Sequence, residues 1–289
     1  MANEITTTSA NDLSYAAEIL ASAILDNFYG NLIAGPFVRS ADISGAPTRA
    51  KSFPISPALA AASIAEGVDL ANTPFATTQV TVTAAEVGLL LTITDLLSVS
   101  DIVDDGYYAA EGGKALAAKF NTDVLALSAG FANQCGATTV NLTEQNILDG
   151  LVTLAAAGVP PPYVGALHPR QWADLIADIG TTVTPAAGPG SQSARAATND
   201  LAVPSSGGLG SLYGVEWYVS HLVPTATAGA DRLGMIVQPS NALGHVSKWD
   251  ARVEFERDAS LRAREIAITA CYGVGELRDA CGIGVLTDA

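Results

Sequence analysis

The sequence predicts an α+β fold in which extended strands precede and follow a long helix and a compact α/β region. Two observations predict the strands: residues 80–83 alternate valine with threonine, and Leu89, Leu91 and Ile93 continue the period of two. A third predicts the helix, because apolar residues between 116 and 131 recur at spacings of four, four, three and four. The helical and extended patterns occupy separate parts of the chain, as in α+β proteins.

The N-terminal segment is predicted to contain one short helix. Asn11-Asp12 offers an N-cap, and apolar residues then recur at helical spacing from Leu13 to Phe28. This pattern predicts an amphipathic helix over about residues 12–29, after a polar, threonine-rich arm.

The next segment is predicted to be a long hairpin. Residues 36–74 carry five prolines among many small residues, which excludes a long helix. Strand-like runs lie at 48–55 and 77–94, on either side of a segment at about 58–73 that we expect to be a flexible tip. Because two strands alone are marginally stable in water, so long a hairpin implies support from a second chain.

The longest helix is predicted to begin at Asp104-Asp105, because acidic residues are favoured in a first turn. Its apolar stripe reaches Phe131, so the helix would run to about Asn133 and measure roughly 40 Å. A compact α/β region follows, and the chain then becomes mostly extended. The expected elements are helices at 144–157 and from His168-Pro169, a flexible loop at 181–210, and strands at 163–167, 214–219, 232–238 and 246–272.

The composition indicates an oligomer. Hydrophobic residues make up 49% of the 289 residues and charged residues only 15%, and the mean hydropathy is +0.30. Such an apolar surplus has to be buried in a membrane, in the core or against other chains. The most apolar run, Val87 to Ile93, is far shorter than the roughly 20 residues of a spanning helix. The start of the chain, Met1 to Glu4, lacks the features of a signal peptide. We therefore expect no membrane association and extensive contact between chains.

Charge and cysteine content exclude several further classes. The formal net charge is −15 and only four lysines are present, so no basic patch for gripping nucleic acid is visible. An acidic wall can still enclose DNA without binding it. Cys135, Cys271 and Cys281 are odd in number and lack CxxC spacing, which argues against a disulfide framework and a zinc site. We expect reduced, largely buried thiols.

The sequence offers no motif for catalysis. Gly112-Gly113-Lys114 faintly resembles a phosphate loop, but Tyr108 replaces its first glycine and Ala115 its Ser/Thr. The three histidines are far apart and fit no metal-ligand spacing, so we expect capping or structural roles for them. Asp104-Asp105 is better explained as a helix start than as a metal pair. The prediction is therefore a protein that is not an enzyme, with no cofactor and no metal.

The order of these segments resembles the major capsid proteins of tailed bacteriophages, the Hong Kong 97-like fold. Local strings also resemble that family. They are Ile64-Ala65-Glu66-Gly67 in the extended E-loop, Tyr107-Tyr108 and Asn121 to Leu125 in the spine helix, Ala166 to Trp172 at a helix start of the axial domain (A-domain), and Gly210 to Ser220 in a later A-domain strand. Each string is weak alone, and their collinear order over about residues 12–275 carries the resemblance.

The resemblance implies a division of the chain into five parts. They are an N-terminal arm with a short helix (1–45), an E-loop hairpin (46–97), the spine helix of the peripheral domain or P-domain (98–140), the A-domain (141–240), and P-domain strands with the C-terminal segment (241–289). Two departures are visible. No long charged scaffolding extension is present, and Lys51 lies at the base of the E-loop, so the cross-link between Lys and Asn known in the family is not predicted.

The resemblance also implies partners and a location. The partners are many copies of this chain in hexamers and pentamers, a portal, scaffold or decoration proteins, and packaged double-stranded DNA held by proximity alone. The expected location is the virion capsid, assembled in the host cytoplasm. The candidate inter-subunit contacts are Lys51, Ile64, Glu66, Asp69, Arg252, Glu254, Glu256, Arg257, Arg262 and Arg264.

Two alternatives stay open. One is an encapsulin, a cellular nanocompartment with the same fold that houses an enzyme. The other is an enzyme with a distributed site, or an adhesin with a surface rich in alanine and threonine. Particles that contain protein cargo would favour the first, and monomers or small oligomers the second.

Overall fold

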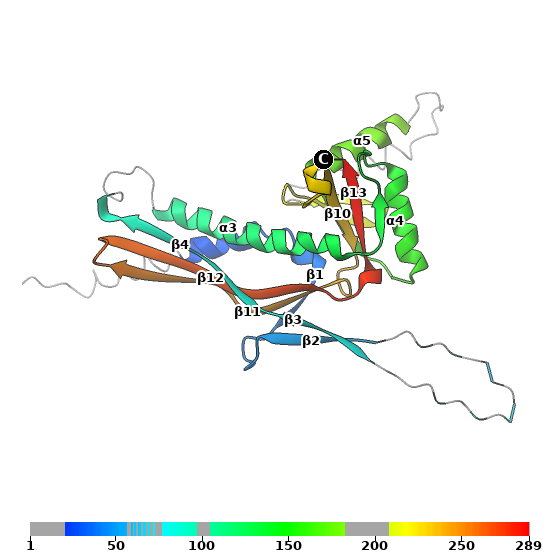
Figure 1. The fold of residues 1–289 in the computed structure, drawn as a ribbon, viewed down its shortest axis with the longest axis horizontal. Helices are drawn as coiled ribbons and strands as arrows, with labels where there is room; N and C mark the ends of the chain where they lie inside the picture. The colour runs from blue at the N-terminus through cyan, green and yellow to red at the C-terminus, as the bar shows by residue number, and fades with distance from the viewer. Residues whose placement is uncertain are drawn as a thin grey trace, which may run out of the picture.

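The computed structural model describes residues 21–56, 77–96, 105–182 and 208–288, and isolated positions between 57 and 76. Two sheets and one long helix, α3 (Asp105–Ala126), form the main framework. In Figure 1, α3 lies along one face of a four-stranded sheet, and a second sheet with helices α4 and α5 lies at one end of it. The start of the predicted N-terminal helix and most of the predicted flexible tip and loop lie outside the described residues.

The four-stranded sheet has the order β1-β11-β12-β4. Its strands are β1 (Val38–Asp42), β4 (Ala85–Thr94), β11 (Leu243–Asp258) and β12 (Ala263–Glu276). β1 runs parallel to β11, whereas β11–β12 and β12–β4 are antiparallel. In the register, Ile268 faces Leu89 and Ile266 faces Leu91, and all four belong to the apolar cluster under α3. The period of two seen in the sequence therefore gives β4 one face packed against the helix.

The predicted hairpin is shorter than the sequence suggested. β2 (Ala50–Ile55) pairs only with β3 (Thr78–Thr83), and the pair lies on the side of the four-stranded sheet away from α3 (Figure 1). The chain then crosses into β4, which pairs with β12. We expected residues 77–94 to form one arm of the hairpin. Instead, residues 85–94 join the four-stranded sheet, because Leu89, Leu91 and Ile93 would be exposed in a two-stranded arm and are covered in the sheet. We call the β2–β3 pair with its connecting residues the arm.

Helix α3 ends earlier than the predicted Asn133. It continues as a 3-10 turn over Leu127–Gly130, and Phe131 takes an extended conformation. The Phe131 ring is buried and lies directly against Gly282, where any side chain would collide with the ring. Burial of this ring in the second sheet therefore ends the helix, although Phe131 continues the apolar stripe in the sequence.

Gly112 and Gly113 of α3 serve close packing. A Cβ atom on Gly112 would meet the Cδ1 methyl of Ile268, and one on Gly113 would lie 2.5 Å from the carbonyl oxygen of Ile24, in the helix at residues 21–30. The phosphate-loop resemblance at these residues is thus explained by helix packing.

We expect Gly113→Ala to lower the free energy of unfolding by about 1–2 kcal/mol relative to Gly112→Ala. Both changes raise helix propensity equally, but the Ile268 methyl can rotate away and the backbone carbonyl of Ile24 cannot. Chemical denaturation of the two variants measures this difference. Equal stabilities would contradict the packing role of Gly113.

The second sheet has the order β5-β13-β10-β6-β8-β7, with β9 also paired to β10. Its strands are β5 (Gln134–Gly136), β6 (Tyr163–Leu167), β7 (Gly208–Leu212), β8 (Val215–Val219), β9 (Thr225–Ala226), β10 (Asp231–Val237) and β13 (Gly282–Asp288). The helices of this part of the protein are α4 (Glu144–Ala156) and α5 (Pro169–Thr182). The predictions of α4, β6, α5, β8 and β10 are confirmed. The C-terminal strand β13 was not predicted, and its residues were grouped with the P-domain strands at 241–289. It pairs with β10 and β5 of the second sheet.

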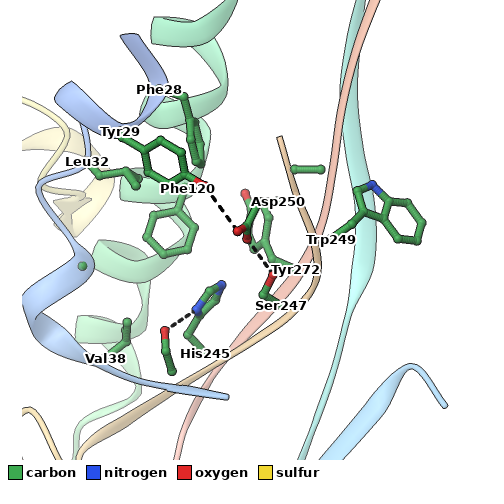
Figure 2. A pocket seen from close by; sticks show the side chains of 13 residues that line it. Phe28, Tyr29, Leu32, Val38, Phe120, His245, Ser247, Trp249, Asp250 and Tyr272 are labelled. Carbon is green, nitrogen blue, oxygen red and sulfur yellow. Dashed lines mark hydrogen bonds between the residues drawn. The ribbon is translucent and has the colours of Figure 1, made fainter. Parts of the chain in front are cut away.

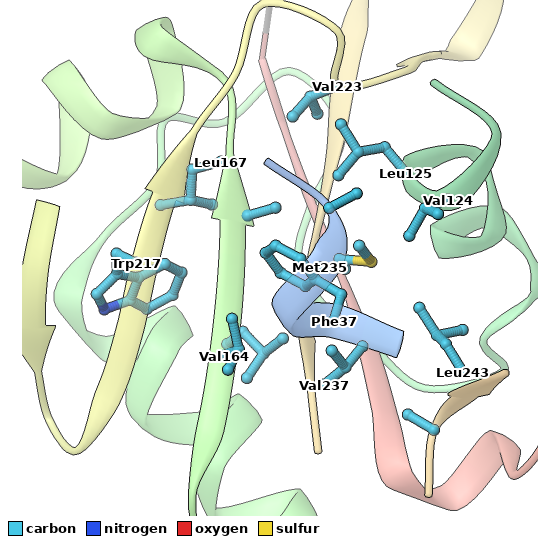
Figure 3. Packing of buried hydrophobic residues seen from close by; sticks show 14 of the residues in the cluster. Phe37, Val124, Leu125, Val164, Leu167, Trp217, Val223, Met235, Val237 and Leu243 are labelled. Carbon is cyan, nitrogen blue, oxygen red and sulfur yellow. The ribbon is translucent and has the colours of Figure 1, made fainter. Parts of the chain in front are cut away.

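One continuous core joins the two sheets. Phe37, in a 3-10 turn at Gly35–Phe37, is fully buried and lies among Val124, Leu125 and Met235 (Figure 3). Trp217 is also fully buried and packs directly against Gly165 on the neighbouring strand β6. The three cysteines are free and buried, as predicted, and burial raises the pKa of the Cys135 thiol to about 12.

Candidate assembly surfaces

The base of the arm is anchored to the body of the protein. Phe53 and Val82 of the arm pack with Val246 and Leu277 in a small buried cluster. The guanidinium of Arg278 also donates a hydrogen bond of 2.7 Å to the carbonyl oxygen of Ser56, just after β2. The base of the arm is therefore held in place.

A lysine ammonium holds the loop that leads into the arm. The Nζ atom of Lys248 donates to the carbonyl oxygens of Ile43 at 3.1 Å and Ser44 at 3.4 Å, and also to that of Ala46. These contacts satisfy carbonyl groups that lack a strand partner, and they join the loop to β11. The direction of the arm thus depends on side chains of the four-stranded sheet.

Four of the predicted contact residues lie on the arm. Lys51 is exposed on β2, and within the described residues its side chain makes no ion pair or hydrogen bond. Ile64, Glu66 and Asp69 are exposed beyond the paired strands, and 47% of the Ile64 surface is accessible. A single exposed apolar side chain is ordinary on a protein surface, so the role of these residues as contacts stays a prediction.

The tip of the β11–β12 hairpin carries a paired arginine. Arg257 makes two parallel hydrogen bonds of 2.6 Å to the carboxylate of Asp95, which follows β4. The hydrogen bond from Arg257 lowers the pKa of Asp95, and the positive charges of Arg257, Arg264 and Arg262 lower it further. Arg257, predicted as an inter-subunit contact, is therefore already paired within its own chain, and Asp95 is the partner that the sequence analysis missed.

The hairpin turn beyond Arg257 is held by one carboxylate. Asp258 accepts hydrogen bonds from the backbone nitrogens of Ser260 at 2.7 Å and Leu261 at 3.1 Å. Arg262 completes the turn with a left-handed φ of 51°. This turn brings Arg257, Arg262 and Arg264 together at one end of the sheet.

An acidic groove lies on the face of the four-stranded sheet opposite α3. Glu254, Glu256 and Glu265 line a hollow of about 220 Å³ together with Leu90, Phe255 and Ala267. Glu256 and Glu265 are direct cross-strand neighbours, an arrangement of like charges that destabilises an isolated sheet. Leu90 is 57% exposed. The period of two predicted its outward direction, because Leu89 and Leu91 face α3.

Arg252 makes a different contact from the other charged residues of the hairpin. Its guanidinium stands 5.4 Å from the centre of the Trp249 ring, a cation–π contact within one strand. The ten predicted contact residues therefore fall into separate groups on the arm, at the hairpin tip, in the acidic groove and at Trp249.

A cavity of about 220 Å³ lies between the helix at residues 21–30, β1, α3 and the strands β11 and β12. Figure 2 shows the rings of Phe28, Tyr29, Phe120, Tyr272 and His245 gathered on one side of the strands, whereas Trp249 points away from them. The Phe120 ring lies 5.1 Å from His245 and 5.2 Å from Tyr272, measured between ring centres. Nδ1 of His245 lies 2.8 Å from the hydroxyl of Ser40. We call this the aromatic cavity.

His245 is expected to make stability depend on pH. Burial lowers the pKa of His245, and the nearby Asp250 opposes this only in part. In the unfolded chain a histidine takes up its proton near pH 6.5, so below that pH the unfolded state binds more protons. The free energy of unfolding therefore falls as the pH drops through about 6.5.

His245→Asn, which can keep a hydrogen bond to Ser40, should reduce that fall. Denaturation of the unassembled subunit at pH 7, 6 and 5 measures it. An unchanged pH dependence in the variant would contradict the role of His245.

The described residues hold no group of three or more His, Cys, Asp or Glu side chains placed to bind a metal ion. His168, one of the histidines with an expected structural role, accepts a hydrogen bond of 3.2 Å from the backbone nitrogen of Arg170 at the start of α5. Among the described helices, none has the length and hydropathy needed to span a bilayer.

Comparison with known proteins gives matches at the level of structure. No protein-family model and no curated protein sequence matches the chain. The capsid of cyanophage P-SCSP1u is similar with a TM-score of 0.64 and 16% identity, over 89% of this chain and 88% of that one. The capsid of cyanophage Pam1 is similar with a TM-score of 0.63 and 12% identity, over 92% of each chain.

A virus-like particle from Pyrococcus furiosus is also similar, with a TM-score of 0.57 and 12% identity. The match covers 93% of this chain and 98% of that chain. At these identities the shared property is the fold. The fold predicted from the order of segments is confirmed, and this chain has the Hong Kong 97-like fold of bacteriophage capsid proteins.

Proposed function

We propose that this chain is the major capsid protein of a tailed bacteriophage. The observation that supports this most is that phage capsid chains match its fold over about nine-tenths of both partners. The arm supports it further, because it forms a sheet of only two strands, and contact with another chain would add to the stability that its anchored base provides.

In this proposal many copies form hexamers and pentamers that close into an icosahedral shell around double-stranded DNA. The arm is the E-loop and lies across a neighbouring copy. α3 and the four-stranded sheet form the P-domain, and residues 141–240, with β13, form the A-domain around the symmetry axes. Portal, scaffold and decoration proteins complete the virion, which assembles in the host cytoplasm, and the chain has no enzymatic activity.

The net charge of −15 suits a shell that holds DNA without gripping it. In the proposed assembly the members of the predicted contact set other than Arg257, which pairs with Asp95, meet neighbouring copies. These residues are Lys51, Ile64, Glu66 and Asp69 on the arm, and Arg252, Glu254, Glu256, Arg262 and Arg264 on the β11–β12 hairpin.

A second candidate is a cellular nanocompartment shell of the encapsulin type. The similarity to the Pyrococcus furiosus particle, over 98% of that chain, supports this second candidate. The contents of particles purified from their natural source separate the two. We expect nuclease-protected double-stranded DNA inside. Particles that lack DNA and carry a folded protein cargo would contradict the phage proposal and support the nanocompartment.

A further inference from the structure

The aromatic cavity holds a carboxylate without a cationic partner. The two oxygens of Asp250 accept hydrogen bonds from the hydroxyls of Tyr29 at 3.3 Å and Ser247 at 2.8 Å, both neutral donors. Within the described residues, Asp250 forms no ion pair with a lysine or arginine. The basic residues nearest to Asp250 along β11 make other contacts. Lys248 donates to carbonyl oxygens, and Arg252 stacks on the ring of Trp249.

The floor of the cavity is aromatic. Phe28, Phe120 and Tyr272 are buried, whereas Tyr29 and Asp250 stand exposed at the rim (Figure 2). Burial and the charge of Asp250 raise the pKa of Tyr29, so its hydroxyl stays protonated and donates to the carboxylate. Tyr272 likewise donates to Asp123 at 2.9 Å. Tyr29 therefore supports the carboxylate at the rim, whereas Tyr272 contributes its ring to the floor.

We propose that the aromatic cavity binds a primary alkylammonium group. The ammonium lies at the rim beside Asp250, where it donates to the carboxylate and keeps part of its hydration. The alkyl chain lies on the floor formed by Phe28, Phe120 and Tyr272. The arrangement follows the general preference of such groups to bury the stem and keep the charged head in water.

The lining excludes other classes of ligand. An anion would meet the Asp250 carboxylate, and a divalent metal would find one carboxylate where it needs several ligands. A neutral alkyl group would gain the apolar floor but no attraction from that carboxylate. His245, the basic side chain in the lining, is kept uncharged by burial that lowers its pKa, so it does not repel an ammonium at neutral pH.

The ammonium could come from a free amine or from a lysine of another copy of this chain. Of the four lysines, Lys114 and Lys119 form ion pairs on α3 and Lys248 binds carbonyl oxygens. Lys51, on the arm, is exposed and makes no such contact within the described residues. If a lysine of another copy supplies the ammonium, we therefore expect it to be Lys51.

The test is saturation-transfer NMR on the purified full-length protein with n-butylammonium chloride as the probe. n-Butanol, similar in length and neutral, is the comparison ligand. We expect the ammonium probe to bind and Asp250→Asn to weaken its binding by about fivefold or more. Asp26→Asn is the matched control, because it makes the same charge change on an exposed residue of the helix at 21–30, outside the cavity.

A second part of the experiment, on assembled particles, shows whether the ammonium comes from a free amine or from Lys51 of another copy. If the amine is free, wild-type particles bind the probe. If Lys51 of another copy fills the cavity, wild-type particles do not bind it, Lys51→Gln particles do, and adding Asp250→Asn abolishes that binding. Binding of n-butanol as strong as that of the ammonium, equal binding by the Asp250→Asn and Asp26→Asn variants, or no binding to wild-type or Lys51→Gln protein would overturn the proposal.

Discussion

Deletion of residues 58–71 is expected to leave a folded subunit that forms no stable shells. The two sheets, α3 and the continuous core lie elsewhere in the chain, and the base of the arm is held by Phe53, Val82 and Arg278. The deleted residues follow β2 and precede β3, so the remaining strands can still pair. What the deletion removes is the part of the arm that we propose lies on a neighbouring copy.

Two measurements check this expectation. Chemical denaturation of the unassembled variant should give an unfolding midpoint close to that of the wild type, which shows that the subunit folds. Sedimentation and electron microscopy should then show loss of closed particles, or particles that fall apart at lower temperature. Shells with the yield and stability of the wild type would contradict the role of the arm.

Gln171→Leu is expected to destabilise the subunit by about 3–5 kcal/mol. Gln171 is fully buried at the start of α5. Its oxygen accepts from the backbone nitrogen of His168 at 3.0 Å, and its amide hydrogens share three acceptors on β10 and β13. These acceptors are the carbonyls of Arg232 at 3.1 Å and Val285 at 3.0 Å, and the hydroxyl of Thr287 at 2.8 Å. Leucine fills a similar volume but leaves these buried polar groups without their partner.

Gln145→Leu is the matched control for that substitution. Gln145 lies exposed on α4 and donates to Asp149 at 2.7 Å, so its replacement should change stability by about 0.5 kcal/mol or less. Denaturant unfolding of both variants measures the difference. A change below about 1 kcal/mol for Gln171→Leu would show that the buried network contributes little.

Local sequence signals predicted three of the seven strands of the second sheet, β6, β8 and β10, and the helices α4 and α5. The strands β5, β9 and β13 were not predicted, and β7 begins at Gly208, inside the segment predicted to be a loop. Thr143 accepts a hydrogen bond of 3.4 Å from the backbone nitrogen of Asn146 and begins α4, next to the predicted start at residue 144. β6 was identified from a buried apolar run after three prolines, and α5 from His168-Pro169. These signals act over a few residues, so one sequence is enough to reveal them.

The errors concern contacts between distant parts of the chain. β4 looked like the second strand of the hairpin because its alternation continues that of β3, and nothing local shows that it pairs with β12 instead. β13 joins the second sheet through β10, far away in the sequence. The close approach of Gly113 to Ile24 is equally nonlocal. Pattern periodicity shows which face of a strand is buried, but not which element covers it.

The candidate surfaces could be predicted only as sets of charged residues. Their side-chain partners come from other elements. Arg257 pairs with Asp95 after β4, and Asp250 meets Tyr29 from the helix at 21–30. Neither pair has a spacing that a sequence pattern could reveal.

The central proposal is that this chain closes into a shell, and cryo-electron microscopy of the purified full-length protein tests it most directly. We predict closed icosahedral particles in which the arm of each subunit lies across a neighbouring copy. A preparation that contains folded monomers or small oligomers alone, at concentrations where related shells assemble, would contradict it.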